Sequence, residues 1–577
     1  MSTLIHVTHE AVQKVGGIGA VLQGFFTSQC YNKNVGRSIL VGPGDAGTQE
    51  LLAKSGKILY SSLTGADAGG WTARFRPVQE RFGVGIIYGL RTFSDKTTGV
   101  ASNPEVLLLD VSNPNLERLG DFKRMLYERF GIRSDLYHTW EYEQYVRLAA
   151  PGLAALGAID VAKSPPAVIL AHEFMGMPLV LAAIAQGSRA YKTVFYAHEV
   201  ATMRRIVEGH PGHDTMFYNV LKQAMANGKF VEDVFGIQAP FFKHALVSAA
   251  RFCDLILCVG DHVLSEMKFL GADFASKNLR LAYNGVPAYD VSVDDVEQSK
   301  ARLQAYTERI LEFKPDFVFS HVTRMALSKG MWRDLKVLWY LEKKFRQTGR
   351  TGVLYLLSSE LGAPRKGIEI LDMESRYSWP VGHREGYPDL SGGEADFYVH
   401  MQKFNVCARQ IRVILVNQFG WSRSSCGAMM PPDMEFLDIR KGTDIEFGQS
   451  IYEPFGIAQL EPLSFGGLCV ITNICGCAGF VDKVTGGQGA KNVLAADYTQ
   501  MPDGNATLDK VLSIGPRERG AAEEKEAERV AGEILNRLPT DRQGREAFVK
   551  SGGELAKKMS WEVVSRDYLL PALKDLG

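Results

Sequence analysis

The sequence predicts an α/β protein built from two doubly wound, Rossmann-like domains. Short runs rich in Val, Ile and Leu recur along the chain, and amphipathic segments of helix length, such as residues 334–346, lie between many of them. Continuous apolar strands alternating with helices are typical of parallel sheets covered by helices on both faces. Because this alternation continues over 577 residues, it is too long for one sheet, and two domains are the simplest interpretation.

The apolar runs locate the expected strands. In the first half they cover residues 4–8, 38–41, 84–88, 106–110, 167–171, 193–197 and 255–259. In the second half they cover residues 317–321, 353–357, 412–416 and 468–472.

A turn sequence, Asn284-Gly-Val-Pro287, precedes a polar, acidic stretch and predicts the domain boundary. The first domain is therefore expected over 1–290 and the second over 291–545. Residues 546–577 are expected to include a C-terminal helix that packs back on the first domain, with Trp561 and Tyr568 facing inward.

Charge and hydropathy exclude several classes of protein. Lys plus Arg and Asp plus Glu both number 65, so the net charge is zero and no global field attracts nucleic acid. Hydrophobic residues make up 46% of the chain, which excludes a mainly disordered protein. No uncharged apolar run approaches the roughly 18 residues of a membrane span, and the N-terminus lacks the pattern of a secretory signal. We therefore expect a cytoplasmic protein without a membrane partner, whose eight cysteines are mostly buried free thiols.

A glycine-rich loop follows the first expected strand. It reads Lys14-Val-Gly16-Gly17-Ile-Gly19, and residues 20–26 after it are expected to form a helix. Glycines allow a ligand to approach the backbone closely, and amides at a helix start can bind an anion. Lys14 could add a charge for a phosphate or a donor for a sugar hydroxyl. A tight turn with a surface lysine explains the same residues.

Two cations, Arg324 and Lys329, follow the strand expected at 317–321. In open parallel sheets, ligands bind beyond the carboxyl ends of the strands. Two fixed positive charges there can hold a diphosphate and stabilise the charge that develops as a phosphate leaves. Ordinary surface basic residues are the alternative.

A third segment begins at Glu453 and runs to Glu461. Pro454 and Gly456 mark a loop, and an apolar helix is expected to follow through Leu463. Amides at that helix start could bind phosphate, and Glu453 could accept hydrogen bonds from sugar hydroxyls. Glu461, about two helical turns later, could hold a ribose diol on the same side. Helix-capping acids without a function are the alternative.

Two strands are expected to end in His-Glu pairs, His172-Glu173 and His198-Glu199. Either histidine could bond a substrate hydroxyl or balance charge, although a core histidine is more often structural. The spacing of a zinc-protease His-Glu-x-x-His motif is absent, so no metal site is predicted.

Together these residues resemble the glycogen and starch synthases, which are retaining glycosyltransferases of the GT-B fold. The resemblance rests on the family's motifs in the family's order: the Lys14-Val-Gly-Gly loop, His172-Glu173, His198, Asn284-Gly-Val, the Arg324 and Lys329 pair, and Glu453 to Glu461.

The resemblance implies two Rossmann-like domains facing a deep cleft, and transfer of glucose from a nucleoside diphosphate glucose to the non-reducing end of an α-1,4-glucan. No cofactor is implied. By the resemblance, the catalytic residues are His198, Arg324, Lys329 and Glu453. The implied substrate-binding residues are Lys14, Gly16, Gly17, Glu173, Phe455, Gly456, Ile457 and Glu461.

Three alternatives remain open from the sequence. They are a related GT-B transferase with a small acceptor, of the sucrose or trehalose type, a glucan phosphorylase, and a catalytically silent glucan-binding protein. No sequence pattern predicts the nucleotide base of the donor, the oligomeric state or allosteric control. Residues 374–449 exceed what a compact domain needs, and their role is not predicted either.

Overall fold

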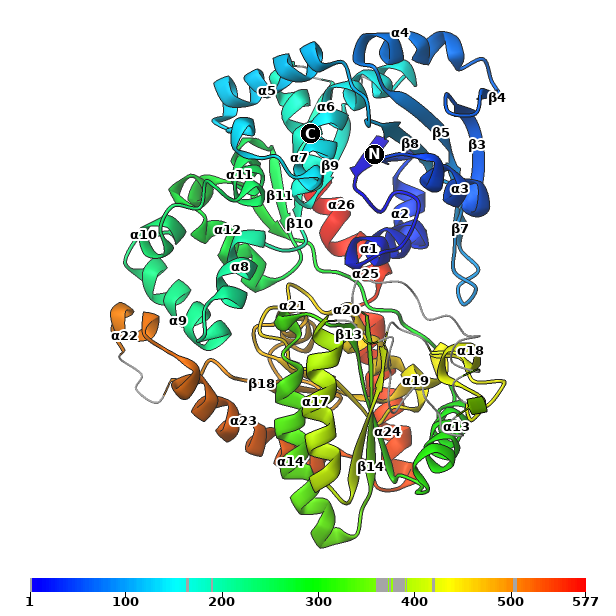
Figure 1. Ribbon diagram of the computed structural model, residues 1–577, viewed down its shortest axis with the longest axis vertical. Helices are drawn as coiled ribbons and strands as arrows, with labels where there is room; N and C mark the ends of the chain where they lie inside the picture. The colour runs from blue at the N-terminus through cyan, green and yellow to red at the C-terminus, as the bar shows by residue number, and fades with distance from the viewer. Residues whose placement is uncertain are drawn as a thin grey trace. The chain divides into compact units, whose positions relative to one another are not determined.

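The computed structural model of the chain (Figure 1) describes residues 3–161, 166–187, 190–359, 392–417, 421–501 and 506–576, with the isolated positions 372, 375, 376 and 390. It divides into two compact units. Unit 1 comprises residues 1–205, 224–285 and 561–577, and unit 2 comprises residues 206–223 and 286–560. Besides the segment 206–223, which belongs to unit 2, the division falls after Gly285 and after Ser560, whereas the sequence predicted boundaries after 290 and 545.

Unit 1 is built on a ten-stranded sheet with the order β12-β11-β10-β9-β1-β2-β8-β5-β3-β4. Its strands are β1 (Thr3–Val7), β2 (Arg37–Pro43), β3 (Gly56–Ser61), β4 (Ala66–Asp67), β5 (Gly85–Arg91), β8 (Glu105–Asp110), β9 (Ala167–His172), β10 (Tyr191–Ala197), β11 (Leu255–Cys258) and β12 (Leu279–Leu281).

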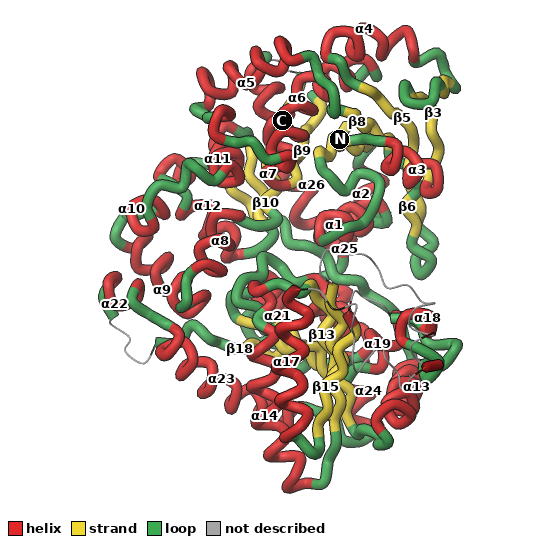
Figure 2. Tube along the Cα trace, viewed as in Figure 1, coloured by secondary structure: helices red, strands yellow, loops and turns green. Residues whose placement is uncertain are grey.

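The helices of unit 1 connect these strands and cover the sheet (Figure 2). They include α1 (Gly17–Phe26), α2 (Gln29–Asn34), α3 (Ala46–Ser55), α4 (Thr72–Phe82), α5 (Leu116–Phe130), α6 (Trp140–Ala158), α7 (Glu173–Ala185), α10 (Val231–Phe235), α11 (Phe242–Ser248), α12 (Asp261–Phe269), α25 (Trp561–Val564) and α26 (Leu570–Lys574). Helix α8 (Ala201–Gly209) begins in unit 1 and ends in unit 2.

One edge of the unit 1 sheet departs from the all-parallel prediction. Strands β12 to β8 in the sheet order are parallel, whereas β8–β5, β5–β3 and β3–β4 pair antiparallel. The cause is local, because the small hairpin of β6 (Phe93–Ser94) and β7 (Ala101–Ser102) reverses the chain between β5 and β8. A hairpin needs only a short turn, whereas a parallel connection needs a crossover.

The C-terminal segment of unit 1 packs against α1 and α2. A Cβ placed on Gly24 would lie 2.1 Å from the Trp561 ring, so only glycine leaves room for the indole. The Glu562 carboxylate accepts hydrogen bonds from the amides of Gln29 (2.5 Å) and Cys30 (2.9 Å), which satisfies unpaired N–H groups at the start of α2. The rings of Tyr568 and Tyr283 meet edge to face at 5.2 Å.

Unit 2 is built on a six-stranded, all-parallel sheet with the order β15-β14-β13-β16-β17-β18. Its strands are β13 (Phe317–Arg324), β14 (Gly352–Ser359), β15 (Ile411–Val416), β16 (Ile445–Gly448), β17 (Leu468–Thr472) and β18 (Val493–Ala496). Its helices are α9 (His213–Ala226, which ends in unit 1), α13 (Val293–Leu311), α14 (Met331–Thr348), α17 (Gly392–Cys407), α18 (Arg423–Cys426), α19 (Phe436–Gly442), α20 (Ile457–Leu460), α21 (Gly476–Thr485), α22 (Leu508–Leu512), α23 (Pro516–Arg537) and α24 (Arg542–Lys558).

Alternate residues of the unit 2 strands enter two separate cores. Phe317 and Phe319 of β13 pack in a core with residues of α14, α17 and α23, whereas Val318 packs on the opposite face with residues of α13 and α19. Because successive side chains of a strand point to opposite faces, a strand buried on both faces must be apolar throughout. This is why the continuous apolar runs predicted the central strands of the sheet.

Residues 206–223 join unit 2 through a buried ion pair that the sequence did not predict. The guanidinium of Arg333 on α14 lies 2.6 and 2.9 Å from the two carboxylate oxygens of Asp214, and both side chains are fully buried. Glu523 of α23 accepts a third bond from Arg333 at 3.1 Å. Removing one member would leave a buried charge unpaired, so this network fixes the segment to unit 2.

Part of the predicted 374–449 insertion lies outside the described residues, namely positions 374, 377–389, 391 and 418–420. Its described part forms α17, β15, α18, α19 and β16, of which β15 and β16 belong to the central sheet. Within the described chain, no helix combines the length and apolarity needed to cross a bilayer.

Candidate functional site

The glycine-rich loop of unit 1 is shaped by a carboxylate that the sequence analysis missed. Glu10 is 1% exposed, and its Oε2 accepts hydrogen bonds from the amides of Val15 (2.6 Å) and Gly16 (2.7 Å). A Cβ on Gly19 would lie 2.5 Å from the same oxygen, which explains the glycine there. Two loop amides are therefore already used by Glu10, while Lys14 and Gly17 are exposed.

The two predicted histidines of unit 1 are joined by a third, His6. Nδ1 of His172 lies 2.9 Å from Nε2 of His198, and Nε2 of His172 lies 2.9 Å from Nδ1 of His6. His6 and His172 are fully buried, and the His172 and His198 rings stack at 5.1 Å with 9° between their planes. The structure thus brings His172 and His198 together in unit 1.

The three histidines are neutral at physiological pH. Burial lowers the pKa of His6 to about 3 and that of His198 to about 3, and burial together with the neighbouring imidazoles holds the pKa of His172 well below its usual range. A neutral imidazole has one N–H donor and one acceptor nitrogen. His198 is therefore a hydrogen-bonding group and not a cation.

Glu173 contacts the backbone of His198. Its Oε1 accepts a hydrogen bond from the His198 amide and another, at 2.7 Å, from the Glu199 amide, while its Oε2 is buried with no partner among the described residues. Glu173 has a φ of +63°, which is strained for a residue with a side chain. Burial, with the Glu199 carboxylate nearby, raises the pKa of Glu173 well above its usual range.

In unit 2, Lys329 and Glu453 form an ion pair. Nζ of Lys329 lies 2.6 Å from Oε2 of Glu453, which also accepts from Gln459 Nε2 at 3.2 Å and from Ser450 Oγ at 3.3 Å. Arg324 ends β13, is exposed, and has no partner among the described residues. One free and one paired cation thus follow the carboxyl end of the same strand.

The loop after Glu453 is held from α21. The Cys477 amide donates to the Phe455 carbonyl at 2.9 Å, and the Gly476 amide donates to the Glu453 carbonyl at 3.1 Å. Gly456 has a φ of +89°, and a Cβ there would lie 2.6 Å from Oε1 of Gln459. Only glycine is accommodated at this position without strain.

The helix that was predicted to run through Leu463 is shorter in the structure. Helix α20, which begins at Ile457, ends at Leu460, and Glu461–Phe465 form a 3₁₀ turn. Glu461 lies 3.1 Å from Nη2 of Arg440, a buried guanidinium whose Nη1 lies 2.9 Å from Glu446. Glu453 and Glu461 are therefore paired with different cations and do not lie along one helix.

Neither protein-family models nor curated protein sequences match this chain. Solved structures do. A UDP-forming α,α-trehalose-phosphate synthase from Burkholderia xenovorans matches with a TM-score of 0.51 and 12% identity, over 100% of this chain and 99% of that chain. The OtsA apo structure matches with a TM-score of 0.50 and 11% identity, over 100% and 98%. The catalytic domain of starch synthase IV from Arabidopsis thaliana, bound to ADP and acarbose, gives 0.47 and 13%, over 98% and 99%.

The chain has the GT-B fold. This confirms the fold class that the sequence predicted, with two Rossmann-like sheets. At identities of 11 to 12%, the matches with TM-scores of at least 0.50 establish the fold and nothing finer.

Several polar residues around the predicted groups of this GT-B chain were not found from the sequence. Glu10, His6, Arg440 and Gln459 each contact a predicted residue or its loop. His6 lies in the first apolar strand, but its contact with His172 follows from the pairing of β1 with β9, which the sequence does not display.

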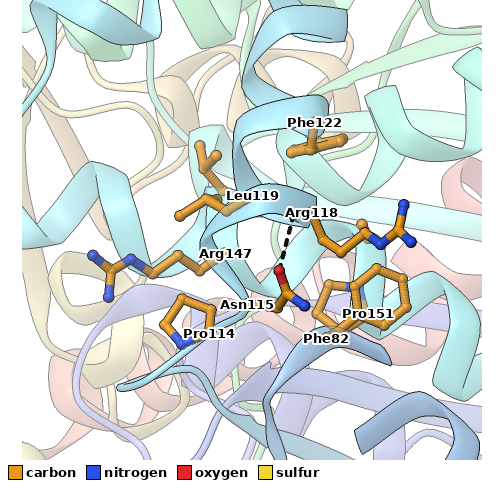
Figure 3. Close-up of a pocket in the computed structure, with 10 residues that line it drawn as sticks. Phe82, Pro114, Asn115, Arg118, Leu119, Phe122, Arg147 and Pro151 are labelled. Atoms are coloured by element: carbon orange, nitrogen blue, oxygen red, sulfur yellow. Dashed lines mark hydrogen bonds between the residues drawn. The ribbon is translucent and has the colours of Figure 1, made fainter. Parts of the chain in front are cut away.

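The GT-B chain shows no metal site and one pocket with polar side chains among its described residues. Among the described residues, no group of three or more His, Cys, Asp or Glu side chains could hold a metal ion. A shallow pocket in unit 1 is lined by Phe82, Pro114, Asn115, Arg118, Leu119, Phe122, Val146, Arg147, Ala150 and Pro151 (Figure 3). Oδ1 of Asn115 accepts from the Arg118 amide at 3.2 Å and caps α5, and the two arginines that line the pocket are paired with Asp121 and Glu143.

Proposed function

We propose that this protein is a retaining glycosyltransferase that moves a glucosyl group from a nucleoside diphosphate glucose. The observation that carries the proposal is the arrangement of unit 2, where Arg324 and the Lys329–Glu453 pair follow β13 of a parallel sheet in a GT-B chain. Ligands of such sheets bind beyond the carboxyl ends of the strands. The charges there suit a diphosphate on one side and sugar hydroxyls on the other.

The donor binds by replacing the contact between Lys329 and Glu453 with contacts of its own. In the structure, Lys329 and Glu453 lie 2.6 Å apart and neutralise each other. The diphosphate takes the place of Glu453 beside Lys329, and the freed carboxylate accepts hydrogen bonds from glucose hydroxyls. Arg324, which has no partner among the described residues, adds the second cation, and amides of the loop at Phe455 to Ile457 add donors.

The chemical step depends on stabilising the departing diphosphate. As the bond between the anomeric carbon and the diphosphate oxygen breaks, negative charge grows on that oxygen, and Arg324 and Lys329 stabilise it. One such group contributes about 3 kcal/mol, or about a hundredfold in rate. For a retaining transfer, the acceptor hydroxyl attacks from the face that the diphosphate leaves, and its proton passes to the diphosphate.

Unit 1 supplies the acceptor side. Lys14 on the exposed loop and His198, a neutral imidazole, are proposed to bind sugar hydroxyls of the acceptor, and Glu173 fixes the backbone of His198. Exclusion of water from the bound donor matters because hydrolysis of the donor competes with transfer.

A small sugar or sugar phosphate is the acceptor that the comparisons favour. The Burkholderia xenovorans structure, which has a TM-score of 0.51, is of a UDP-forming α,α-trehalose-phosphate synthase. An α-glucan is the second candidate, and it is supported by the ordered motifs from Lys14 to Glu461.

The test offers UDP-, ADP- and GDP-glucose to the protein with glucose, glucose 6-phosphate or glycogen as acceptor. Released nucleoside diphosphate reports transfer, and chromatography of labelled product separates a disaccharide from a longer glucan. We expect acceptor-dependent release with one of the donors. No release with any pair would refute the transferase, and growth of glycogen alone would overturn the small acceptor.

A further inference from the structure

A continuous chain of hydrogen bonds runs through unit 1 to the free nitrogen of His198. It begins at Ser38 Oγ, which lies 3.0 Å from the hydroxyl of Tyr31. That hydroxyl lies 2.8 Å from Nε2 of His6. Two imidazole contacts of 2.9 Å each then lead through His172 to Nε2 of His198. Among the described residues, Nδ1 of His198 has no partner.

The register of the sheet places the three histidines in line. Strands β1, β9 and β10 are neighbours and parallel. His6 on β1 pairs with Leu170 on β9, and His172 lies two residues after Leu170. His172 in turn pairs with Tyr196 on β10, and His198 lies two residues after Tyr196. Because side chains alternate between the faces of a sheet, steps of two keep all three imidazoles on one face.

We propose that Tyr31, His6 and His172 form a relay that fixes the tautomer of His198, so that its Nδ1 carries the hydrogen and faces the substrate as a donor. His198 is the group that touches substrate, and the other three are positioning residues. This role for Nδ1 rests on the proposed function, whereas the tautomer itself does not.

The direction of the relay follows from the strength of its first bond. Each neutral imidazole must donate with one nitrogen and accept with the other, so one hydrogen bond decides all the rest. A phenol hydroxyl is a stronger acid than a serine hydroxyl or a neutral imidazole, and an imidazole nitrogen accepts better than a hydroxyl oxygen. Tyr31 therefore donates to Nε2 of His6.

The remaining hydrogens are then determined. Nδ1–H of His6 donates to Nε2 of His172, and Nδ1–H of His172 donates to Nε2 of His198. His198 is left with its hydrogen on Nδ1. Protonation of any member would set two donors against each other, and the depressed pKa values of all three histidines agree with a neutral chain. Burial thus keeps the relay intact at physiological pH.

A sugar oxygen that accepts from Nδ1–H of His198 would be held in one orientation. A histidine free to exchange tautomers would present a donor for part of the time and an acceptor for the rest. The relay removes that ambiguity without placing a charge beside the sugar.

The experiment measures the tautomers in the ligand-free protein by two-bond ¹⁵N–¹H correlation spectra, with ¹⁵N in the histidine rings. The signals of His198 are assigned through the loss that His198→Gln causes. We expect Nδ1–H for His6, His172 and His198, against the Nε2–H form that dominates in free histidine. An Nε2–H tautomer at His198 in the unsubstituted protein would overturn the relay.

The relay also predicts an effect of Tyr31→Phe on His198, although the two residues are joined only through His6 and His172. Loss of the phenol donor should allow Nε2–H to appear at His198. Tyr196→Phe is the matched control, because Tyr196 is also buried and its ring lies 4.4 Å from that of His198, but its hydroxyl donates to the Ala282 carbonyl at 3.0 Å. The control should leave the tautomers unchanged.

A His198 that stays fully Nδ1–H in Tyr31→Phe, or that responds equally to Tyr196→Phe, would overturn the proposal. Failure of the nucleotide-sugar assay would refute the proposed function and leave these spectra unaffected, so the two ideas fail separately. If transfer is observed, Tyr31→Phe should lower kcat/KM by about two- to tenfold, the worth of one neutral hydrogen bond.

Discussion

Replacing Lys329 by alanine tests the donor half of the proposed site. The side chain is 16% exposed, and its Nζ lies 2.6 Å from a carboxylate that is 12% exposed, so the charge acts in a largely dehydrated position. A unit charge about 4 Å from the departing phosphate is worth about 4 kcal/mol at an effective dielectric constant of about 20. Measured losses of single stabilising groups are about 3 to 4 kcal/mol. We therefore expect Lys329→Ala to lower kcat by roughly a hundredfold or more.

The assay is release of nucleoside diphosphate from the nucleotide glucose that the protein accepts, at saturating acceptor. Lys344→Ala on exposed α14 surface is the matched control and should retain full activity. Glu453 keeps its bonds to Ser450 and Gln459, so the melting temperature of Lys329→Ala should stay within a few degrees of the parent. A folded Lys329→Ala protein with kcat within threefold of the parent would refute the role of this cation.

Three other predictions concern stability. Gly456→Ala adds a Cβ at a φ of +89° and 2.6 Å from an amide oxygen, so the free energy of unfolding measured in urea should fall by about 1 to 3 kcal/mol. The loss should exceed that of Gly486→Ala, whose Cβ meets nothing within 4 Å. Arg440→Met should lower the free energy of unfolding by about 3 to 5 kcal/mol in the same assay, because it leaves the buried charge of Glu446 without its guanidinium. Adding Glu446→Gln should recover most of that loss. No recovery would contradict the pairing. Burial lowers the pKa of His6 from 6.5 to about 3, so between these pH values the imidazole is protonated in the unfolded chain and neutral in the folded chain. The free energy of unfolding should therefore fall by about 1.4 kcal/mol per pH unit as the pH drops from about 6.5 towards 3. The variant His6→Gln should lose this contribution, and an unchanged slope would show that His6 is charged in the folded protein.

Hydrophobic patterning predicted the central strands well. Strands such as β9, β10, β14 and β15 are buried on both faces over most of their length, so each contains a continuous apolar run that stands out without any knowledge of the fold. All the expected strands form, and the eight cysteines are free thiols, six of them buried: Cys253, Cys258, Cys426, Cys469, Cys475 and Cys477.

Two of the strands that were not predicted have identifiable causes. Strand β16 is four residues long and includes Glu446, which is 1% exposed because Arg440 and Ser320 bind its carboxylate. A charged residue in so short a run hides the strand from a hydrophobic pattern. Strand β3 lies near the sheet edge with its first residues exposed, so its sequence lacks a continuous apolar run.

Motif spacing predicted the candidate site residues but not the residues that they contact. Lys329 and Glu453 are 124 positions apart in the sequence, and no local pattern states that they pair. The Glu10 carboxylate that holds the glycine loop and the His6 imidazole that reaches His172 depend on strand register and loop closure. These are properties of the folded chain, and a single sequence does not display them.

The most direct test of the account is a crystal structure of the protein with the nucleoside diphosphate of its donor bound. The account predicts the diphosphate between Arg324 and Lys329, beside the amides of residues 455–457, with the Lys329–Glu453 bond opened. A diphosphate bound elsewhere on the chain, with that ion pair still closed, would contradict it.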